Sequence, residues 1–107
     1  MADEALLVLT TFPDAATAQR IGRQLVEEKC AACVNILPAV ESIYWWQGNV
    51  EEAKETLVFF KTTADRFESL QARLRQLHPY EVPEIIALPI DRGLPDYLRW
   101  VANACAK

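Results

Sequence analysis

The stretch from residue 33 to residue 61, CVNILPAVESIYWWQGNVEEAKETLVFFK, decides the fold of this chain. Two runs rich in Val, Ile, Tyr, Trp and Phe meet at the tetrapeptide QGNV, where Gly-Asn can supply the positive φ angles that a tight hairpin turn requires. The pattern predicts one long antiparallel hairpin with Gly48 and Asn49 as its two loop residues. In this register Trp46 faces Glu51.

The predicted hairpin is longer than the domain that carries it. Each arm has about 12 residues and would span ~40 Å at ~3.3 Å per residue, whereas a globule of this length has a diameter of roughly 34 Å. The overhang would carry Tyr44, Trp45 and Trp46 into water beside an unpaired strand edge, which favours aggregation unless another chain covers it. We therefore expect a homo-oligomer in which these aromatics and Trp100 contact neighbouring subunits, although such a cluster could also stack on a base or a ligand.

Length and composition indicate a single domain that spans residues 1–107. The first residues, MADEALLVLTTF, combine acidic side chains with an apolar run too short for a signal peptide or a membrane span. The formal net charge of −4 argues against a nucleic-acid binder, because such surfaces carry clustered Lys and Arg. We expect a cytoplasmic protein with no nucleic-acid or membrane partner.

A strand and a helix are predicted before the hairpin. Residues 6–9 form a continuous apolar run, which is typical of a strand in the middle of a sheet. From Asp14 to about Lys29 apolar residues recur at helical spacing, and either Thr11 or Asp14 can cap this helix.

The part of the chain after the hairpin predicts a helix, a strand and a further helix. The first of these helices has an apolar stripe, is capped by Thr62 or Thr63, and ends at His78-Pro79. Residues 84–88 form a short β-branched run typical of a strand, and Pro95 introduces the last helix.

This order of elements predicts an α+β fold, the ferredoxin-like βαββαβ sandwich, with a long hairpin between the second and third strands and an extra C-terminal helix. In such a sheet the first and third strands lie inside and the other two lie at the edges. The prolines agree, because Pro38 falls in the second strand and Pro83 and Pro89 flank the fourth.

His78, the one histidine of the chain, is the first candidate for a metal ligand. Its imidazole, with the nearby carboxylates of Glu81 and Glu84, suits copper, zinc or nickel, and a symmetric oligomer could complete the coordination from another subunit. The alternative is a structural histidine at a helix end, where the ring favours the negative C-terminal dipole.

Cys30 and Cys33 form a CxxC pattern, which is typical of redox or zinc chemistry. Their expected place at a helix C-terminus opposes a reactive thiolate, because the helix dipole there disfavours negative charge. No second CxxC or CxxH supplies further zinc ligands. We interpret the pair as two small buried residues.

The sequence shows no catalytic machinery. One histidine cannot support a Ser-His-Asp triad, and neither GxGxxG nor GxxxxGK[ST] is present. An acylphosphatase-like enzyme would need an arginine in a phosphate loop after the first strand, and the segment TTFP has none. We therefore expect a protein that is not an enzyme.

Several segments together make the chain resemble the CutA family of divalent-cation tolerance proteins. They are LVLTTFPDAATAQRIG, AACVNILPAVESIYWWQG, ETLVFFKTT, LHPYEVPEIIALPI and YLRW, and they span nearly the whole chain in the order of the family. The resemblance implies a ferredoxin-like protomer, a homotrimer whose hairpins wrap neighbouring subunits, and a link to copper and other divalent metals.

The metal site that the resemblance implies is only partly present. In bacterial relatives copper binding is attributed to a cysteine at the end of the first strand and to two successive histidines. Thr10 and Leu77 stand at two of these positions, which leaves His78. The remaining candidate ligands are Cys33, which matches the cysteine of the family's AACVN segment, and the carboxylates Glu81 and Glu84.

The sequence thus predicts a homotrimeric divalent-cation tolerance protein that binds copper and possibly other divalent metals and contributes to the response to metal ions. The alternative is a trimeric signalling protein similar to the PII proteins, which share the protomer fold and bind small ligands between subunits. That function would require Lys61 or Arg92 to line the cleft as an anion-holding group.

Overall fold

A computed structural model describes residues 4–107. The first three residues, which belong to the acidic N-terminal stretch considered above, lie outside the described part. The elements in chain order are β1 (Ala5–Phe12), α1 (Ala15–Glu27), β2 (Cys33–Trp46), β3 (Asn49–Thr63), α2 (Phe67–Leu77), β4 (Ile86–Pro89) and α3 (Pro95–Cys105).

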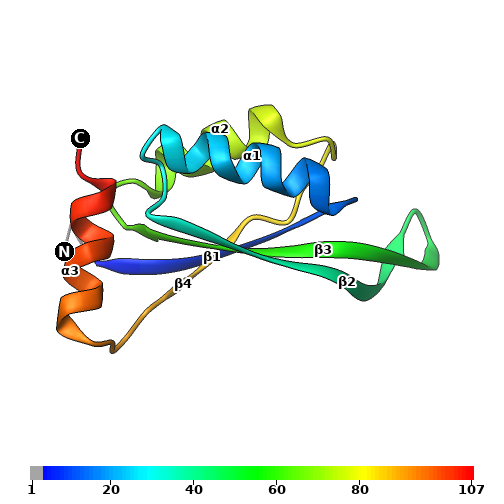
Figure 1. Ribbon diagram of the computed structural model, residues 1–107. Helices are drawn as coiled ribbons and strands as arrows, with labels where there is room; N and C mark the ends of the chain where they lie inside the picture. Colours follow the sequence, from blue (N-terminus) through cyan, green and yellow to red (C-terminus); the bar gives the residue numbers. More distant parts are fainter. Residues whose placement is uncertain (1–3) are drawn as a thin grey trace.

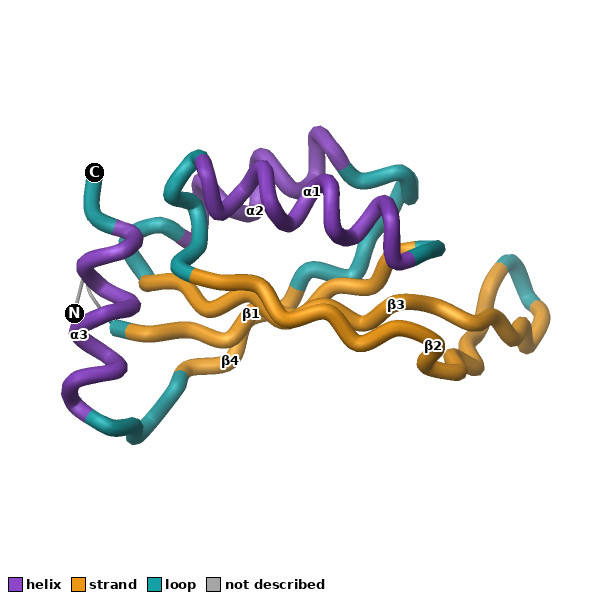
Figure 2. Tube along the Cα trace, in the orientation of Figure 1, coloured by secondary structure: helices purple, strands orange, loops and turns teal. Residues whose placement is uncertain are grey.

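The four strands form one antiparallel sheet in the order β2-β3-β1-β4. Helices α1 and α2 lie together over one face of the sheet, and α3 packs at the end opposite the hairpin turn (Figures 1 and 2). This is the predicted ferredoxin-like sandwich with an added helix. The inner position of β1 and β3 and the edge position of β2 and β4 are confirmed.

Helix α1 begins at a side-chain cap. Asp14 Oδ1 accepts a hydrogen bond of 2.7 Å from the backbone N–H of Thr17, so Asp14 is the cap of the two that the sequence offered. Gly22 lies on the buried face of this helix, and a Cβ there would come within 3.2 Å of Val34 on β2. The missing side chain allows α1 to approach the edge strand.

The core fills the space between the two helices and the sheet. Alternate residues of β1 and β3 point toward the helices, because side chains alternate between the faces of a strand, and they meet the apolar stripes of α1 and α2. The fully buried apolar residues of this cluster are Val8, Phe12, Ala18, Ile21, Leu25, Val58, Phe60, Leu70 and Leu74.

Beyond the helices, β2 and β3 continue as a two-stranded ribbon (Figure 1). The strands have 14 and 15 residues, and the molecule measures 44 × 25 × 21 Å along its principal axes. The prediction of a long hairpin that extends past the body of the domain is confirmed.

The predicted register of the hairpin is wrong, because the two loop residues lie one position earlier in the sequence than predicted. Gln47 and Gly48 are the loop residues, with φ angles of 50° and 84°, and Trp46 faces Asn49 instead of Glu51. A two-residue turn with both φ angles positive accepts glycine at its second position. The prediction of Gly48 as the first loop residue is therefore wrong.

A β-bulge interrupts the pairing of β2 with β3. Leu37 pairs with Leu57 and Val40 pairs with Glu55, so two residues of β2 stand opposite one residue of β3. Pro38, which has no N–H to donate, falls within this interruption on the edge strand, as its position in the sequence predicted.

Two further predictions need correction. Thr62 and Thr63 do not cap α2, because both belong to β3, and the Thr62 hydroxyl donates instead to the carbonyl oxygen of Cys30 at 2.7 Å. Arg66 precedes the helix without a side-chain cap. Strand β4 begins at Ile86 instead of residue 84, since its pairing with β1 starts only there.

Candidate functional site

His78 follows α2 and is buried against the end of β1. Its side chain stacks on Phe12 with ring centroids 4.4 Å apart. The Nε2 atom lies 2.8 Å from the carbonyl oxygen of Thr11 and 3.3 Å from the Thr10 hydroxyl, and the Nδ1 atom lies 3.1 Å from the backbone nitrogen of Tyr80. The histidine therefore joins the loop after α2 to β1.

These hydrogen bonds define the protonation state of the ring. The Tyr80 N–H donates to Nδ1, so this nitrogen carries no proton, and Nε2–H donates to the carbonyl oxygen of Thr11. Burial lowers the pKa of His78, which favours the same neutral form. Both ring nitrogens thus have partners within the protomer, and the imidazole would have to release one of them to bind a metal.

Cys33 lies far from His78. The sheet register places Cys33 of β2 beside Lys61 of β3, and Lys61 in turn beside Leu7 of β1. Leu7 is four residues along β1 from Thr11, roughly 13 Å at ~3.3 Å per residue, and Cys33 lies two strands further across the sheet. The Cys33 thiol is half-buried and lies 3.8 Å from the Tyr97 hydroxyl. The structure does not bring these two candidate ligands together within one protomer.

Cys30 is buried at the end of the turn after α1. Burial raises the pKa of its thiol, so the group remains protonated and behaves as a small apolar side chain. Cys105 is buried as well, and burial also raises the pKa of its thiol. The three cysteines of the chain are free thiols.

Glu81 and Glu84 do lie together, in a groove of about 810 Å³ between the hairpin and the loop after α2. We call it the acidic groove. Two further carboxylates line it, and three aromatic side chains form part of its walls. Its charged and aromatic lining residues are Glu41, Glu55, Glu81, Glu84, Tyr44, Trp46 and Tyr80.

Tyr80 joins the two walls of the acidic groove. Its hydroxyl donates a hydrogen bond of 2.7 Å to Glu55 Oε2 on β3. Burial, together with this bond to the carboxylate, raises the pKa of the Tyr80 hydroxyl, so it remains a donor at neutral pH. With the Tyr80 backbone bound to His78, one residue links β1, the loop and the hairpin.

The carboxylates of the acidic groove do not converge on one point. Among the described residues, 4–107, no three His, Cys, Asp or Glu side chains lie close enough together to hold a metal ion. Oxygen ligands are present, but a complete coordination shell would need donors from another subunit or from water.

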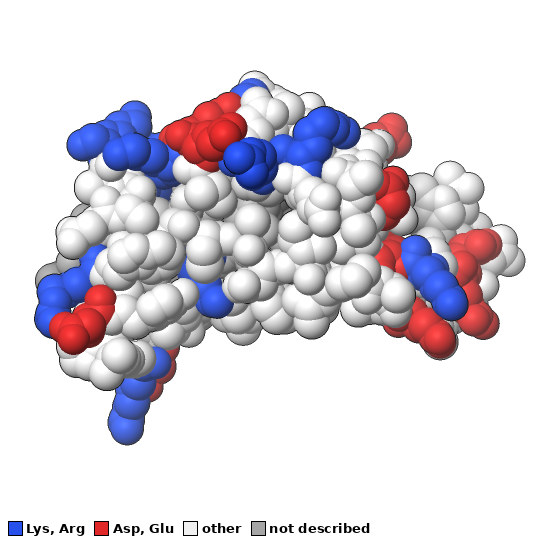
Figure 3. All heavy atoms as spheres, in the orientation of Figure 1, with Lys and Arg blue, Asp and Glu red and all other residues white. Residues whose placement is uncertain are grey.

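Charge is unevenly distributed over the molecule. In the view of Figure 3 acidic side chains gather around the hairpin, whereas most basic side chains lie over the helices. The field of the hairpin end therefore attracts cations. Lys54 is the basic residue nearest in register, since it pairs with Glu41.

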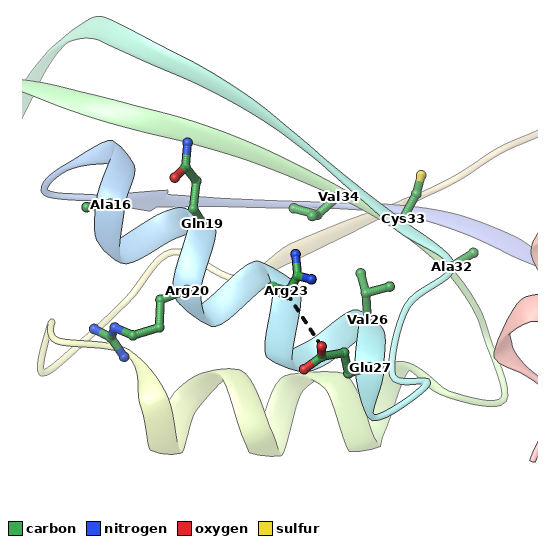
Figure 4. Close-up of a pocket in the computed structure, with 9 residues that line it drawn as sticks. All are labelled: Ala16, Gln19, Arg20, Arg23, Val26, Glu27, Ala32, Cys33 and Val34. Carbon is green, nitrogen blue, oxygen red and sulfur yellow. Dashed lines mark ion pairs between the residues drawn. The ribbon is translucent and has the colours of Figure 1, made fainter.

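A second groove, of about 870 Å³, runs between α1 and the edge of β2 (Figure 4). Arg23 lies in it and forms an ion pair of 3.5 Å with Glu27, whereas the side chain of Arg20 extends away from the strands. Arg23 is thus paired with Glu27, although both side chains are largely exposed to solvent. Neither Lys61 nor Arg92 lines it: Lys61 donates to Asn35 Oδ1 at 2.8 Å and Arg92 pairs with Asp91.

The aromatic residues predicted at subunit contacts are exposed in the protomer. Trp45 has 75% of its surface exposed, and Tyr44, Trp46 and Trp100 are between two-fifths and one-half exposed. Trp100 stacks obliquely on Tyr97, with ring centroids 5.6 Å apart. Large apolar surfaces of this kind are typical of protein contacts.

Glu41 and Glu55 line the acidic groove but are not among the site residues predicted from the sequence. The hairpin register is the sequence signal that could have identified Glu55. The bulge places Glu55 at the base of the hairpin, where the loop after α2 passes. The turn was misplaced, so this neighbourhood was not visible from the sequence.

Comparison with known proteins agrees with the geometry. The model of the family described as CutA1 divalent ion tolerance protein matches residues 6–104. The chain belongs to the CutA1 family. It is 52% identical over 95 residues to the divalent-cation tolerance protein CutA of Thermus thermophilus, which covers 89% of this chain and 92% of that protein.

Solved CutA structures share the fold throughout. The structure of CutA from Xylella fastidiosa superposes with a TM-score of 0.94 at 41% identity, and covers 96% of this chain and 99% of that one. That of CutA1 from Oryza sativa gives a TM-score of 0.91 at 40% identity and covers 94% and 93% of the two chains. No helix within residues 4–107 is long and apolar enough to cross a membrane.

Proposed function

We propose that this chain assembles as a homotrimer that binds divalent cations, copper foremost, and contributes to the response to metal ions without catalysing a reaction. The acidic groove carries the proposal, because four carboxylates line it and, within residues 4–107, no Lys or Arg side chain does. The CutA relatives, which are described as divalent-cation tolerance proteins, support the same proposal.

Glu81 and Glu84 are the proposed metal ligands within one protomer. They lie on the loop that His78 holds in place through the hydrogen bond from Tyr80 N–H, so we assign His78 the role of positioning this loop. Carboxylates alone suit hard cations, and copper favours softer donors. A thiol such as that of Cys33, contributed by another subunit, would supply one.

The trimer is proposed from the family and from the exposed hairpin. A two-stranded ribbon alone is only marginally stable in water, and this one exposes Ile43, Trp45 and Val50 for more than half of their surface. Neighbouring subunits would cover these side chains. We also propose a cytoplasmic location, since the three free cysteines fit a reducing compartment.

Calorimetric titration with Cu(II) tests the metal function. The wild-type protein should bind Cu(II) saturably, and the Glu81→Gln/Glu84→Gln variant should bind it at least about tenfold more weakly, because two charge-assisted ligands are lost. Glu51→Gln/Glu52→Gln is the matched control, with the same change of charge on the hairpin outside the groove, and should retain the wild-type affinity.

Two outcomes would contradict the proposal. Absence of saturable binding to wild type removes the metal function, and an equal loss in both double variants removes the groove as its site. His78→Ala separates the roles of the histidine: an unchanged stoichiometry with weaker binding fits loop positioning, whereas loss of the bound copper would assign the imidazole to the metal.

A further inference from the structure

The β-bulge of β2 lies where the hairpin leaves the body of the domain. Thr56, the residue of β3 opposite the bulge, pairs on its other side with Phe12, the last residue of β1. From Glu55 to the turn, β3 pairs with β2 alone within residues 4–107 (Figure 1). The bulge therefore marks the boundary between the supported sheet and the free ribbon.

The bulge contains a residue in an unfavourable backbone conformation. Ala39 has a φ of 63°, in the left-handed region that residues other than glycine disfavour because the Cβ approaches the following carbonyl oxygen. Such a conformation persists only where the surrounding structure requires it. Its position at the start of the ribbon points to a role in setting how the two strands of the ribbon pair.

The ribbon beyond the bulge carries large apolar side chains on both faces. Paired residues share a face of a sheet, and so do alternate residues of a strand. Phe60 of β3 is buried beneath the helices, and counting along β3 from it places Tyr44 and Trp46 on the face that α1 and α2 leave bare. Ile43 and Trp45 lie on the opposite face, and all four side chains are exposed.

A hairpin without the bulge would reverse these two faces. Regular pairing continued from the start of β2 would bring Trp45, instead of Trp46, opposite Asn49. The turn would then have three residues, the last of them Gly48, and three-residue turns with a left-handed glycine in that place are common in hairpins. A shift by one residue moves every side chain to the other face. Because both faces are apolar here, the hydrophobic pattern does not select between the two registers.

We infer that the bulge at Ala39 selects the register of the hairpin and so decides which aromatic side chains continue the bare face of the sheet. The extra residue in β2 brings Tyr44 and Trp46 onto that face. The same face of the body carries the apolar residues Leu37, Leu57 and Phe59. The consequence for assembly rests on the proposed homotrimer, because a ribbon with reversed faces offers a neighbouring subunit different side chains. The register itself is a property of one chain.

Substitutions at residue 39 test the inference. Ala39→Val disfavours the left-handed conformation, because β-branched residues rarely adopt positive φ angles, whereas Ala39→Gly adopts it freely. Cross-strand nuclear Overhauser contacts report the register. Wild type and Ala39→Gly should show Tyr44 opposite Glu51. Ala39→Val should reduce the ratio of this register to the regular one, with Ile43 opposite Glu51, at least about tenfold.

Sedimentation of the same proteins measures assembly. Ala39→Val should raise the dissociation constant of the trimer at least about tenfold, as its ratio of registers falls, and Ala39→Gly should leave this constant unchanged. A wild type that forms no trimer would contradict the proposed function, whereas the cross-strand contacts still decide the register. A folded Ala39→Val protein with the wild-type contacts would overturn the inference.

A milder series covers the case in which Ala39→Val does not fold. The thermal unfolding midpoints of Ala39→Gly, Ala39→Asn and wild type should decrease in this order, which follows the tolerance of each residue for the left-handed conformation. Equal midpoints would show that this conformation is not under strain and would likewise overturn the inference.

Discussion

The body of the sandwich and the hairpin beyond it share strands β2 and β3 but differ in what covers these strands. Within the body, Val58 and Phe60 of β3 are completely buried beneath α1 and α2. Nearer the turn, Val50 of the same strand and Ile43 of β2 are more than half exposed. One continuous strand thus passes from a covered region into one that this chain leaves open, so the two regions draw stability from different sources.

Removing one large side chain from each region should give the largest difference in the free energy of unfolding. Phe60→Ala should lower the free energy of unfolding by about 3–5 kcal/mol, because it empties a fully buried position. Trp45→Ala should change the unfolding free energy of the dissociated chain by less than about 0.5 kcal/mol, since Trp45 is exposed. Chemical denaturation at several protein concentrations measures both.

Self-association should respond in the opposite way to these changes. Trp45→Ala should lower the fraction of trimer in sedimentation or light scattering, whereas a folded Phe60→Leu variant should retain it. If Trp45→Ala left the oligomer intact at micromolar concentration, the hairpin would not be the region that other subunits stabilise.

A smaller effect is expected at the turn. Gly48 has a φ of 84°, and a Cβ there would meet no atom within 4 Å, so a substitution tests backbone strain without a steric clash. Gly48→Ala should destabilise the protein by about 1–2 kcal/mol, because an L residue other than glycine disfavours this conformation. Thermal unfolding measures the cost.

Gly48→Asn provides the matched control, because asparagine adopts the left-handed conformation more readily than alanine. It should be less destabilising than Gly48→Ala. Equal costs for the two substitutions would mean that the conformation of the turn does not limit the stability of the hairpin.

The smallest effect is expected on the helical surface of the body. Hydrogen bonds from Arg73, followed by one from Gln24, lower the pKa of Glu28 from 4.5 to about 2. The folded state therefore prefers the carboxylate, so the stability from this pair is complete above about pH 4.5 and is lost as the pH falls toward 2.

Arg73→Gln should reduce the loss of stability between these two pH values. The change should be small because the side chains are exposed to solvent, which screens the interaction. Unfolding midpoints measured across this range for both proteins provide the test. Identical pH profiles would show that the pair between α1 and α2 contributes nothing to folding.

The sequence was sufficient to predict most of the fold. The apolar stripes, the cap at Asp14 and the stop at His78-Pro79 act locally, so their signals lie within a few residues. The edge position of Pro38 followed from its missing N–H group. The turn was misplaced because both Gln47-Gly48 and Gly48-Asn49 satisfy the local rule, and only pairing along the whole ribbon selects between them.

The candidate site was less accessible to sequence reasoning. Glu81 and Glu84 were identified from their proximity to His78 in the chain, and the structure places both in the acidic groove. Glu41 and Glu55 reach the groove only through the bulge and the fold of the loop, which are tertiary features. The partners of His78 were also hidden, because Thr11 is 67 residues away in the sequence.

The hydrogen bond between the Tyr80 hydroxyl and Glu55 connects the hairpin to the loop after α2. Glu55 lies next to the bulge, where the ribbon leaves the body, and the tip of the hairpin lies several residues further along the ribbon. Deflection of the tip by a neighbouring molecule therefore pulls on the loop that carries Glu81 and Glu84. If neighbouring subunits bind the tip, we expect assembly to change the width of the groove through this hydrogen bond.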